Sequence, residues 1–115
     1  MARYMFQGQV KLDLLEEYKR RHAAVWPEML RALADAGFRN YSIFLRPTDG
    51  LLIGYFEAED GPAAFAAMSR TDVNARWQSE MTPFFQIPAG KTPDQAFTFL
   101  EEAFHLETQL EQLAE

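Results

Sequence analysis

The sequence contains no cysteine, and this absence excludes disulfide bonds, cysteine nucleophiles and thiolate metal ligands. It also lacks a signal-peptide pattern and any apolar run of about 18 residues, so we expect a chain that neither crosses nor enters a membrane by itself. A sequence without cysteine fits a reducing compartment. We therefore expect a cytoplasmic protein.

Positive charge is scarce as well. Eleven Lys and Arg stand against 17 Asp and Glu, which gives a net charge of −6. Nucleic-acid binding requires basic side chains that neutralise phosphates, so this balance argues against a nucleic-acid partner. Apolar material is plentiful, with 48% hydrophobic residues and ten Phe. The chain is thus too apolar to be disordered, and its 115 residues are the length of one domain.

Apolar periodicity predicts a strand and then a long helix at the start of the chain. Residues 3–10 alternate in the manner of a strand. A helix would follow from Asp13 to about Val25. Its start resembles a capping box, with Glu16 three residues after Asp13.

Proline and glycine mark the next boundaries. Pro27 cannot lie inside a regular helix without a kink, so a second helical segment would begin there and end at Gly37 in the left-handed conformation. Two β-type runs follow, at 40–45 and 51–56. The sequence RPTDG between them has the residues of a hairpin turn.

The second half predicts two further helices and a last strand. Asp-Gly-Pro at 60–62 opens one helix, and Ser69 or Thr71 would cap another over 72–81. A loop rich in proline then leads to a strand over 97–107. The resulting order is β-α-β-β-α-β, with extra helical turns before the last strand.

This order is that of the ferredoxin-like (split βαβ) fold, an α+β class in which helices cover one face of a four-stranded antiparallel sheet. We expect one domain over 1–107 and a helix-prone tail over 108–115. The other sheet face needs a cover, and a second copy of the chain is the simplest one. We therefore predict a homodimer with sheets packed face to face. The contacting face would carry every second residue of the first strand, either Tyr4, Phe6, Gly8 and Val10 or the residues between them.

Two histidines are the main candidates for chemistry. His22 lies one helical turn from Tyr18, on a predicted apolar stripe that also holds Leu14, Val25, Met29 and Leu33. An imidazole titrates near neutrality, so a half-buried one suits general acid–base catalysis; the alternative is a core histidine bonded to a backbone carbonyl. His105 lies in the predicted last strand and is interpreted as an ordinary strand histidine.

Aromatic residues could complete a pocket around His22. Tyr41 lies on one face of its predicted strand and Trp77 lies in the predicted helix over 72–81; core packing is the simpler role for each. Together with Tyr18, they offer an indole face for the C–H side of a sugar and hydroxyls for its OH groups. The spacing of His and carboxylates matches no metal motif, and no glycine loop suits phosphate.

Four stretches together resemble the L-rhamnose mutarotase family: EEYKRRHAAVWPEM (16–29), NYSIFL (40–45), SRTDVNARW (69–77) and EEAFHL (101–106). The resemblance runs from about residue 3 to residue 107. It implies the fold of dimeric ferredoxin-like α/β barrels. It also implies interconversion of the α and β anomers of L-rhamnose without a cofactor.

Residue by residue, the resemblance assigns proton transfer to His22 and sugar contacts to Tyr18 and Tyr41. The family's paired tryptophans fall on Trp77 and Gln78, so an amide stands where the second indole is expected. This departure could change the affinity or the 6-deoxy sugar that fits. The tail after residue 107 runs beyond the family's usual end.

Two other functions are open at this stage. Other dimeric α/β barrels of this topology are cofactor-free or haem-active monooxygenases, and fold does not fix function. A non-catalytic sugar-binding module is the second alternative. A haem protein would show a Soret band, and a binding module would bind sugar without accelerating anomer exchange.

Overall fold

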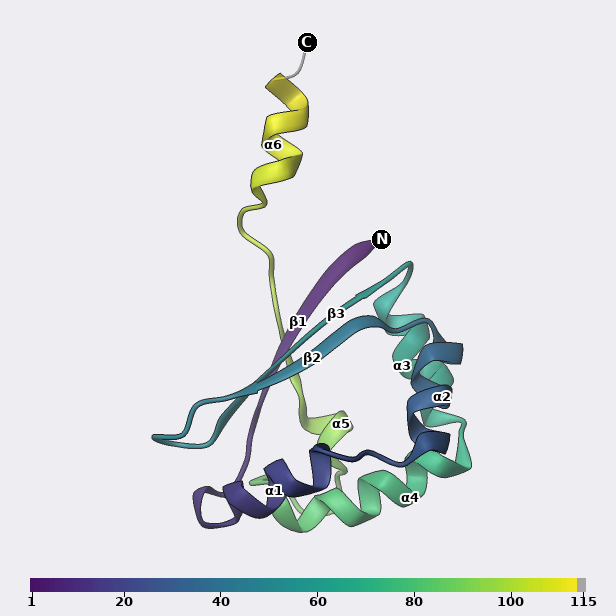
Figure 1. Cartoon of the computed structure of the whole chain (residues 1–115), viewed down its shortest axis with the longest axis vertical. Coiled ribbons are helices and arrows are strands. Elements are labelled where there is room, and N and C mark those ends of the chain that lie inside the picture. Colours follow the sequence, from purple (N-terminus) through teal and green to yellow (C-terminus); the bar gives the residue numbers. More distant parts are fainter. Residues whose placement is uncertain (114–115) are drawn as a thin grey trace.

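The computed structural model describes residues 1–113 and contains a four-stranded antiparallel sheet (Figure 1). The strand order is β2-β3-β1-β4, which is the order of a ferredoxin-like sheet. The predicted α+β fold class is therefore confirmed. The strands are β1 (Ala2–Gln9), β2 (Arg39–Leu45), β3 (Leu51–Ala58) and β4 (Thr98–Leu100).

Helices α1 to α5 gather on one side of the sheet, while α6 stands away from the body at the end of an extended arm (Figure 1). None of the helices in residues 1–113 is both long and apolar enough to cross a membrane. The helices are α1 (Leu15–His22), α2 (Pro27–Ala36), α3 (Gly61–Ser69), α4 (Asp72–Met81), α5 (Pro93–Ala96) and α6 (Leu106–Leu113), with 3₁₀ turns η1 (Leu12–Leu14) and η2 (Thr82–Phe84).

The first predicted helix is shorter than expected at both ends. Asp13 lies inside η1 and makes no capping bond, so the predicted capping box is wrong. The backbone here is held by other pairings, since the N–H of Lys11 donates to the carbonyl of Phe84. Helix α1 ends at His22, and the residue before Pro27 is extended, as proline requires. Val25 consequently lies in a linker instead of a helix.

Local capping chemistry explains most other boundaries. Pro27 is the first residue of α2, and Gly37 ends it with φ of 110°, both as predicted. The Asp60 carboxylate accepts from the N–H of Ala63 at the start of α3. At the start of α4 it is Thr71, and not Ser69, whose hydroxyl accepts a backbone N–H. Helix α5 was missed inside the expected loop.

The predicted last strand over 97–107 is wrong in length. Strand β4 pairs with β1 over only three residue pairs, from Gln7 opposite Thr98 to Met5 opposite Leu100. Beyond that point a side-chain ion pair between Arg3 and Glu102, 3.0 Å long, holds the segment beside β1. His105 is not a strand residue: its Nδ1 accepts from the N–H of Thr108 at the first turn of α6. Of the predicted tail, residues 114 and 115 lie outside the described part.

The sheet has one buried and one exposed face. Phe6, Leu52 and Phe56 on the helix side are fully buried. Phe6 packs so closely over Gly54 that a Cβ there would lie 2.2 Å from the Phe6 ring. The first parity predicted for the open face, Tyr4 to Val10, therefore points into the core, and the alternates occupy the other face. That face carries exposed Met5, Phe44 and Leu100.

Candidate active site

A cavity of about 450 Å³ lies between the helix side of the sheet and helices α1, α2 and α4. Pockets of this size accommodate small molecules, and a monosaccharide fits well within it. Most of the wall is apolar. All the residues predicted from the sequence for a site line this one cavity: Tyr18, His22, Tyr41, Trp77 and Gln78.

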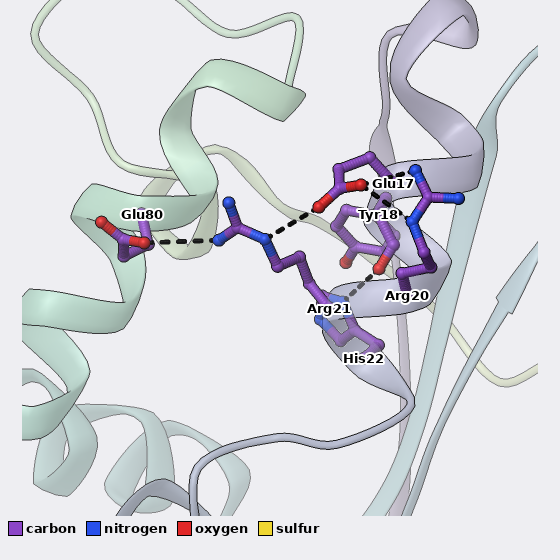
Figure 2. Close-up of polar contacts among 6 residues, drawn as sticks. All are labelled: Glu17, Tyr18, Arg20, Arg21, His22 and Glu80. Atoms are coloured by element: carbon purple, nitrogen blue, oxygen red, sulfur yellow. Dashed lines mark hydrogen bonds and ion pairs between the residues drawn. The ribbon is translucent and has the colours of Figure 1, made fainter.

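The imidazole of His22 is fixed at the end of α1. Its Nδ1 lies 3.0 Å from the backbone carbonyl of Tyr18, as Figure 2 shows. Because a carbonyl only accepts, Nδ1 carries the proton and Nε2 is the nitrogen left for a ligand. The Tyr18 ring stacks on the imidazole at 4.1 Å between centroids, and the Trp77 ring meets it edge-on at 5.3 Å.

Burial lowers the pKa of His22 below its usual value, and the bond to the Tyr18 carbonyl opposes this only in part. The imidazole is therefore neutral at pH 7. A neutral imidazole whose Nδ1–H is already committed can accept a proton at Nε2. The same carbonyl bond is the one expected of a purely structural histidine, so the bond alone does not distinguish the two roles.

Two tyrosines bring hydroxyl groups to the pocket. Tyr18 comes from α1 and Tyr41 from β2, where its ring stacks on Phe38 at 5.2 Å. Burial raises the pKa of both phenols, and the nearby carboxylate of Asp94 adds to the rise for Tyr41. Within residues 1–113 the Tyr55 hydroxyl donates to Glu57, whereas neither pocket hydroxyl has a protein partner. Both therefore stay protonated and free to bind a ligand.

Trp77 forms the α4 side of the pocket. It is 7% exposed, and Trp26 meets it edge-on at 5.0 Å. The guanidinium of Arg76 lies over the Trp26 ring and bonds to Glu28 on α2. Trp26 thus supports the Trp77 indole from behind, and the orientation of that indole is fixed by packing instead of by a polar bond.

Side chains from α4 and the α5 turn form a closed polar ring at the pocket wall. Asn74 Nδ2 donates to Asp94 Oδ2 at 3.1 Å, and Gln78 Nε2 donates to Asn74 Oδ1 at 3.2 Å. The backbone N–H of Asp94 then donates to Gln78 Oε1 at 3.1 Å. Thr92 adds a hydroxyl bond to Asp94 Oδ1 at 2.5 Å. Gln78 is therefore an anchoring residue as well as a lining residue.

An ion-pair bridge ties α1 to α4 beside the pocket (Figure 2). Arg21 bonds to Glu17 on its own helix at 3.1 Å and to Glu80 on α4 at 3.3 Å. Its guanidinium also lies 5.6 Å from the centre of the Phe84 ring. Exposed pairs of this kind contribute little stability, about 0–1 kcal/mol. They connect the helices that carry His22 and Trp77.

Sequence reasoning missed two polar residues of the pocket, Asn74 and Asp94. Asn74 is 5% exposed and one helical turn before Gln78, so helical spacing could have revealed it. Asp94 approaches from a separate turn, and no sequence pattern links it to α4. His105 lies on the arm and does not line the pocket.

These features define a class of protein: a ferredoxin-like α+β domain whose monosaccharide-sized pocket holds a neutral histidine among hydroxyl and indole groups. The L-rhamnose mutarotase family matches residues 3–106. The L-rhamnose mutarotase of Bacillus subtilis is 39% identical over 106 residues, covering 92% of this chain and 96% of that protein. The one from Lactiplantibacillus plantarum is 39% identical over 95 residues, covering 83% and 88%. The chain belongs to the L-rhamnose mutarotase family.

A solved structure agrees with the fold. The crystal structure of an L-rhamnose mutarotase from Formosa agariphila matches with a TM-score of 0.76 and 24% identity, covering 92% of this chain and 99% of that one. The family match ends at residue 106, where α6 begins. Helix α6 is therefore an addition to the part of the chain that the family describes.

Proposed function

We propose that this protein interconverts the α and β anomers of L-rhamnose by acid–base ring opening and closure. The observation that carries the proposal is the state of His22: Nδ1 is committed to a carbonyl, the ring is neutral, and Nε2 is left for a ligand in a sugar-sized pocket. Membership of the L-rhamnose mutarotase family supplies the substrate.

The chemistry requires two proton transfers. Nε2 of His22 takes the proton of the anomeric hydroxyl, the bond from C1 to the ring oxygen breaks, and the ring oxygen receives a proton. The open aldehyde then rotates about C1–C2 and closes to the other anomer by the reverse steps. Acid–base assistance of this kind contributes about 10²–10⁴-fold.

The proton for the ring oxygen comes from a second donor. Tyr18 is the nearest hydroxyl to the imidazole along α1, and its raised pKa keeps that hydroxyl protonated. A water bound between the two groups could take the same role. In either case the donor gives up a proton while His22 becomes an imidazolium, and both protons are returned when the ring closes. Burial raises the pKa of both pocket phenols, which makes a tyrosine a weaker donor than it is in water.

We also propose that the working form is a homodimer joined through the exposed sheet face. That face has an apolar centre, with Phe44 64%, Leu100 42% and Met5 39% exposed. Ionic contacts lie at its end, where Arg3 bonds to Glu102. An apolar centre with a polar rim is the usual anatomy of an interface. Light scattering at micromolar concentration should give twice the chain mass, and a clean monomer would contradict the dimer.

One experiment tests the activity against its rivals. Saturation-transfer NMR on the two anomers of L-rhamnose, with and without protein, measures the exchange rate directly. Faster exchange with protein supports the mutarotase. Sugar binding with an unchanged rate supports a binding module, and a Soret band in purified protein, with no acceleration, supports a haem monooxygenase.

A further inference from the structure

The polar ring at the pocket wall has only one arrangement in which every member is paired. A carboxylate only accepts hydrogen bonds, so Asn74 must present its amide nitrogen to Asp94. The Asn74 oxygen then faces the nitrogen of Gln78, and the Gln78 oxygen accepts the backbone N–H of Asp94. Turning either amide over would set donor against donor. The ring therefore fixes the position of the Asp94 carboxylate.

The fixed carboxylate has acceptor capacity to spare. It offers about four lone-pair sites. Asn74 occupies one on Oδ2 and Thr92 occupies one on Oδ1. Asp94 also lines the cavity and is only partly buried. The carboxylate thus has capacity for further hydrogen bonds at the cavity wall.

A pair of sugar hydroxyls matches that capacity. Adjacent ring hydroxyls present two donors that a carboxylate can accept together, and hydrogen bonds to a charged acceptor are stronger than neutral ones. Tyr41 and Asp94 both line this cavity, and the Asp94 carboxylate contributes to the raised pKa of the Tyr41 phenol. An indole at position 78 could not maintain this site, because its ring nitrogen donates and cannot accept the Asp94 N–H.

We propose that Asp94, held in place by Asn74 and Gln78, is a specificity-determining residue whose carboxylate accepts hydrogen bonds from ring hydroxyls of the sugar. The proposal rests on the proposed function. The ligand class that the proposal defines is a pyranose with one free hydroxyl, or two adjacent free hydroxyls, beside the Asp94 carboxylate. A sugar that lacks the hydroxyl in contact with Asp94 is bound more weakly, while the chemistry at C1 depends on His22.

The test is Asp94→Asn measured with L-rhamnose and with its 2-, 3- and 4-deoxy analogues. The asparagine can still accept from Asn74 and can donate to Thr92, so the ring persists while the charge is lost. Anomer exchange is followed by NMR as a function of sugar concentration, which separates KM from kcat. Asp72→Asn is the matched control, because it also removes one negative charge, at an α4 side chain that is 97% exposed.

In the wild-type protein, at least one deoxy analogue should have a KM about tenfold above that of L-rhamnose, the effect of one hydrogen bond to a charged group. Asp94→Asn should raise the KM for L-rhamnose by a similar factor, with kcat within about threefold, and should abolish the difference between that analogue and L-rhamnose. Asp72→Asn should behave as wild type. A penalty that Asp94→Asn imposes equally on all four sugars would overturn the proposal, because that is the result of a structural role.

A second variant keeps the proposal testable should Asp94→Asn fail to fold. Gln78→Met retains the carboxylate and a similar side-chain volume but removes both ring bonds of the amide. Gln78→Met should raise the KM for L-rhamnose and reduce the KM difference between L-rhamnose and the deoxy analogue that wild type discriminates. An unchanged KM difference would refute the role of the ring. Wild-type protein without anomer exchange would remove the proposed function and this inference together. Wild-type exchange combined with variants that keep the KM difference between that analogue and L-rhamnose would remove the inference alone.

Discussion

Replacing His22 with alanine separates a catalytic from a structural histidine. The imidazole donates a hydrogen bond from Nδ1 to the Tyr18 carbonyl and stacks on the Tyr18 ring. If Nε2 transfers the anomeric proton, His22→Ala should lower the protein-catalysed exchange rate by about 10²–10⁴-fold. The protein should remain folded while this rate is lost.

The expected cost in stability is small, for a structural reason. The carbonyl of Tyr18 lies within α1, and in an α-helix it also accepts the backbone N–H four residues later. Removing the imidazole therefore leaves no carbonyl unpaired. Losing one hydrogen bond costs about 1 kcal/mol, which lowers the melting temperature of a domain this size by about 4 °C.

The assay is saturation-transfer NMR on L-rhamnose anomers, with the melting temperature recorded by circular dichroism on the same samples. His105→Ala is the control, because His105 is the other histidine and lies on the arm away from the pocket. It should retain the full exchange rate. Wild-type exchange in a folded His22→Ala protein would refute the catalytic assignment, and a fall in rate only where the protein unfolds would indicate a structural histidine.

Further predictions concern pH, binding and assembly. Burial holds the pKa of folded His22 below the unfolded value of about 6.5, so the exchange rate should be full at neutral pH and fall as pH drops through the folded pKa. Protonation of His22 favours the unfolded chain, because the pKa is higher there. The stability that neutral His22 contributes is therefore fully present above about pH 6.5 and is lost as the pH falls to the lower pKa of the folded protein. A melting temperature independent of pH between 5 and 7 would count against this. Tyr18→Phe keeps the ring and should raise KM for L-rhamnose severalfold with little change in melting temperature; an unchanged KM would remove Tyr18 from the sugar contacts. Gln78→Trp should alter the relative exchange rates of L-rhamnose and related 6-deoxy sugars, and identical ratios before and after would mean that position 78 is remote from the sugar. Phe44→Glu on the open sheet face should convert the proposed dimer to a monomer in light scattering, and a persistent dimer would place the interface elsewhere.

Local chemistry made part of the fold predictable from the sequence. Pro27 begins α2 because its ring fixes φ, and Gly37 ends it because a residue without a Cβ adopts the left-handed φ of 110° without steric cost. The end of the last strand could not be predicted in this way, because strand pairing depends on the partner β1, which lies about a hundred residues earlier in the chain. Apolar residues after Leu100 therefore predict a longer strand, whereas in the described residues the pairing of β4 with β1 ends at Leu100.

The same distinction applies to the pocket. Tyr18 and His22 are one turn apart, so helical spacing alone predicted that they meet. Asp94 reaches Asn74 and Gln78 because the α5 turn folds back onto α4. Asp94 lies 20 residues after Asn74 and 16 residues after Gln78 in the sequence. The departure at position 78 could be recognised from the sequence, while the groups that accompany it required coordinates.

The closed ring of Asn74, Gln78 and Asp94 also constrains how the sequence can evolve. Each member supplies a donor or acceptor to a neighbour in the ring, so a change that removes one of these groups leaves a polar atom without its partner. A lineage that exchanged the amide at position 78 for an aromatic ring would have to change position 74 or 94 as well, and the first of those steps is costly by itself. The three positions should therefore vary together among relatives, as one inherited unit, while the residues that pair through the backbone around them vary independently.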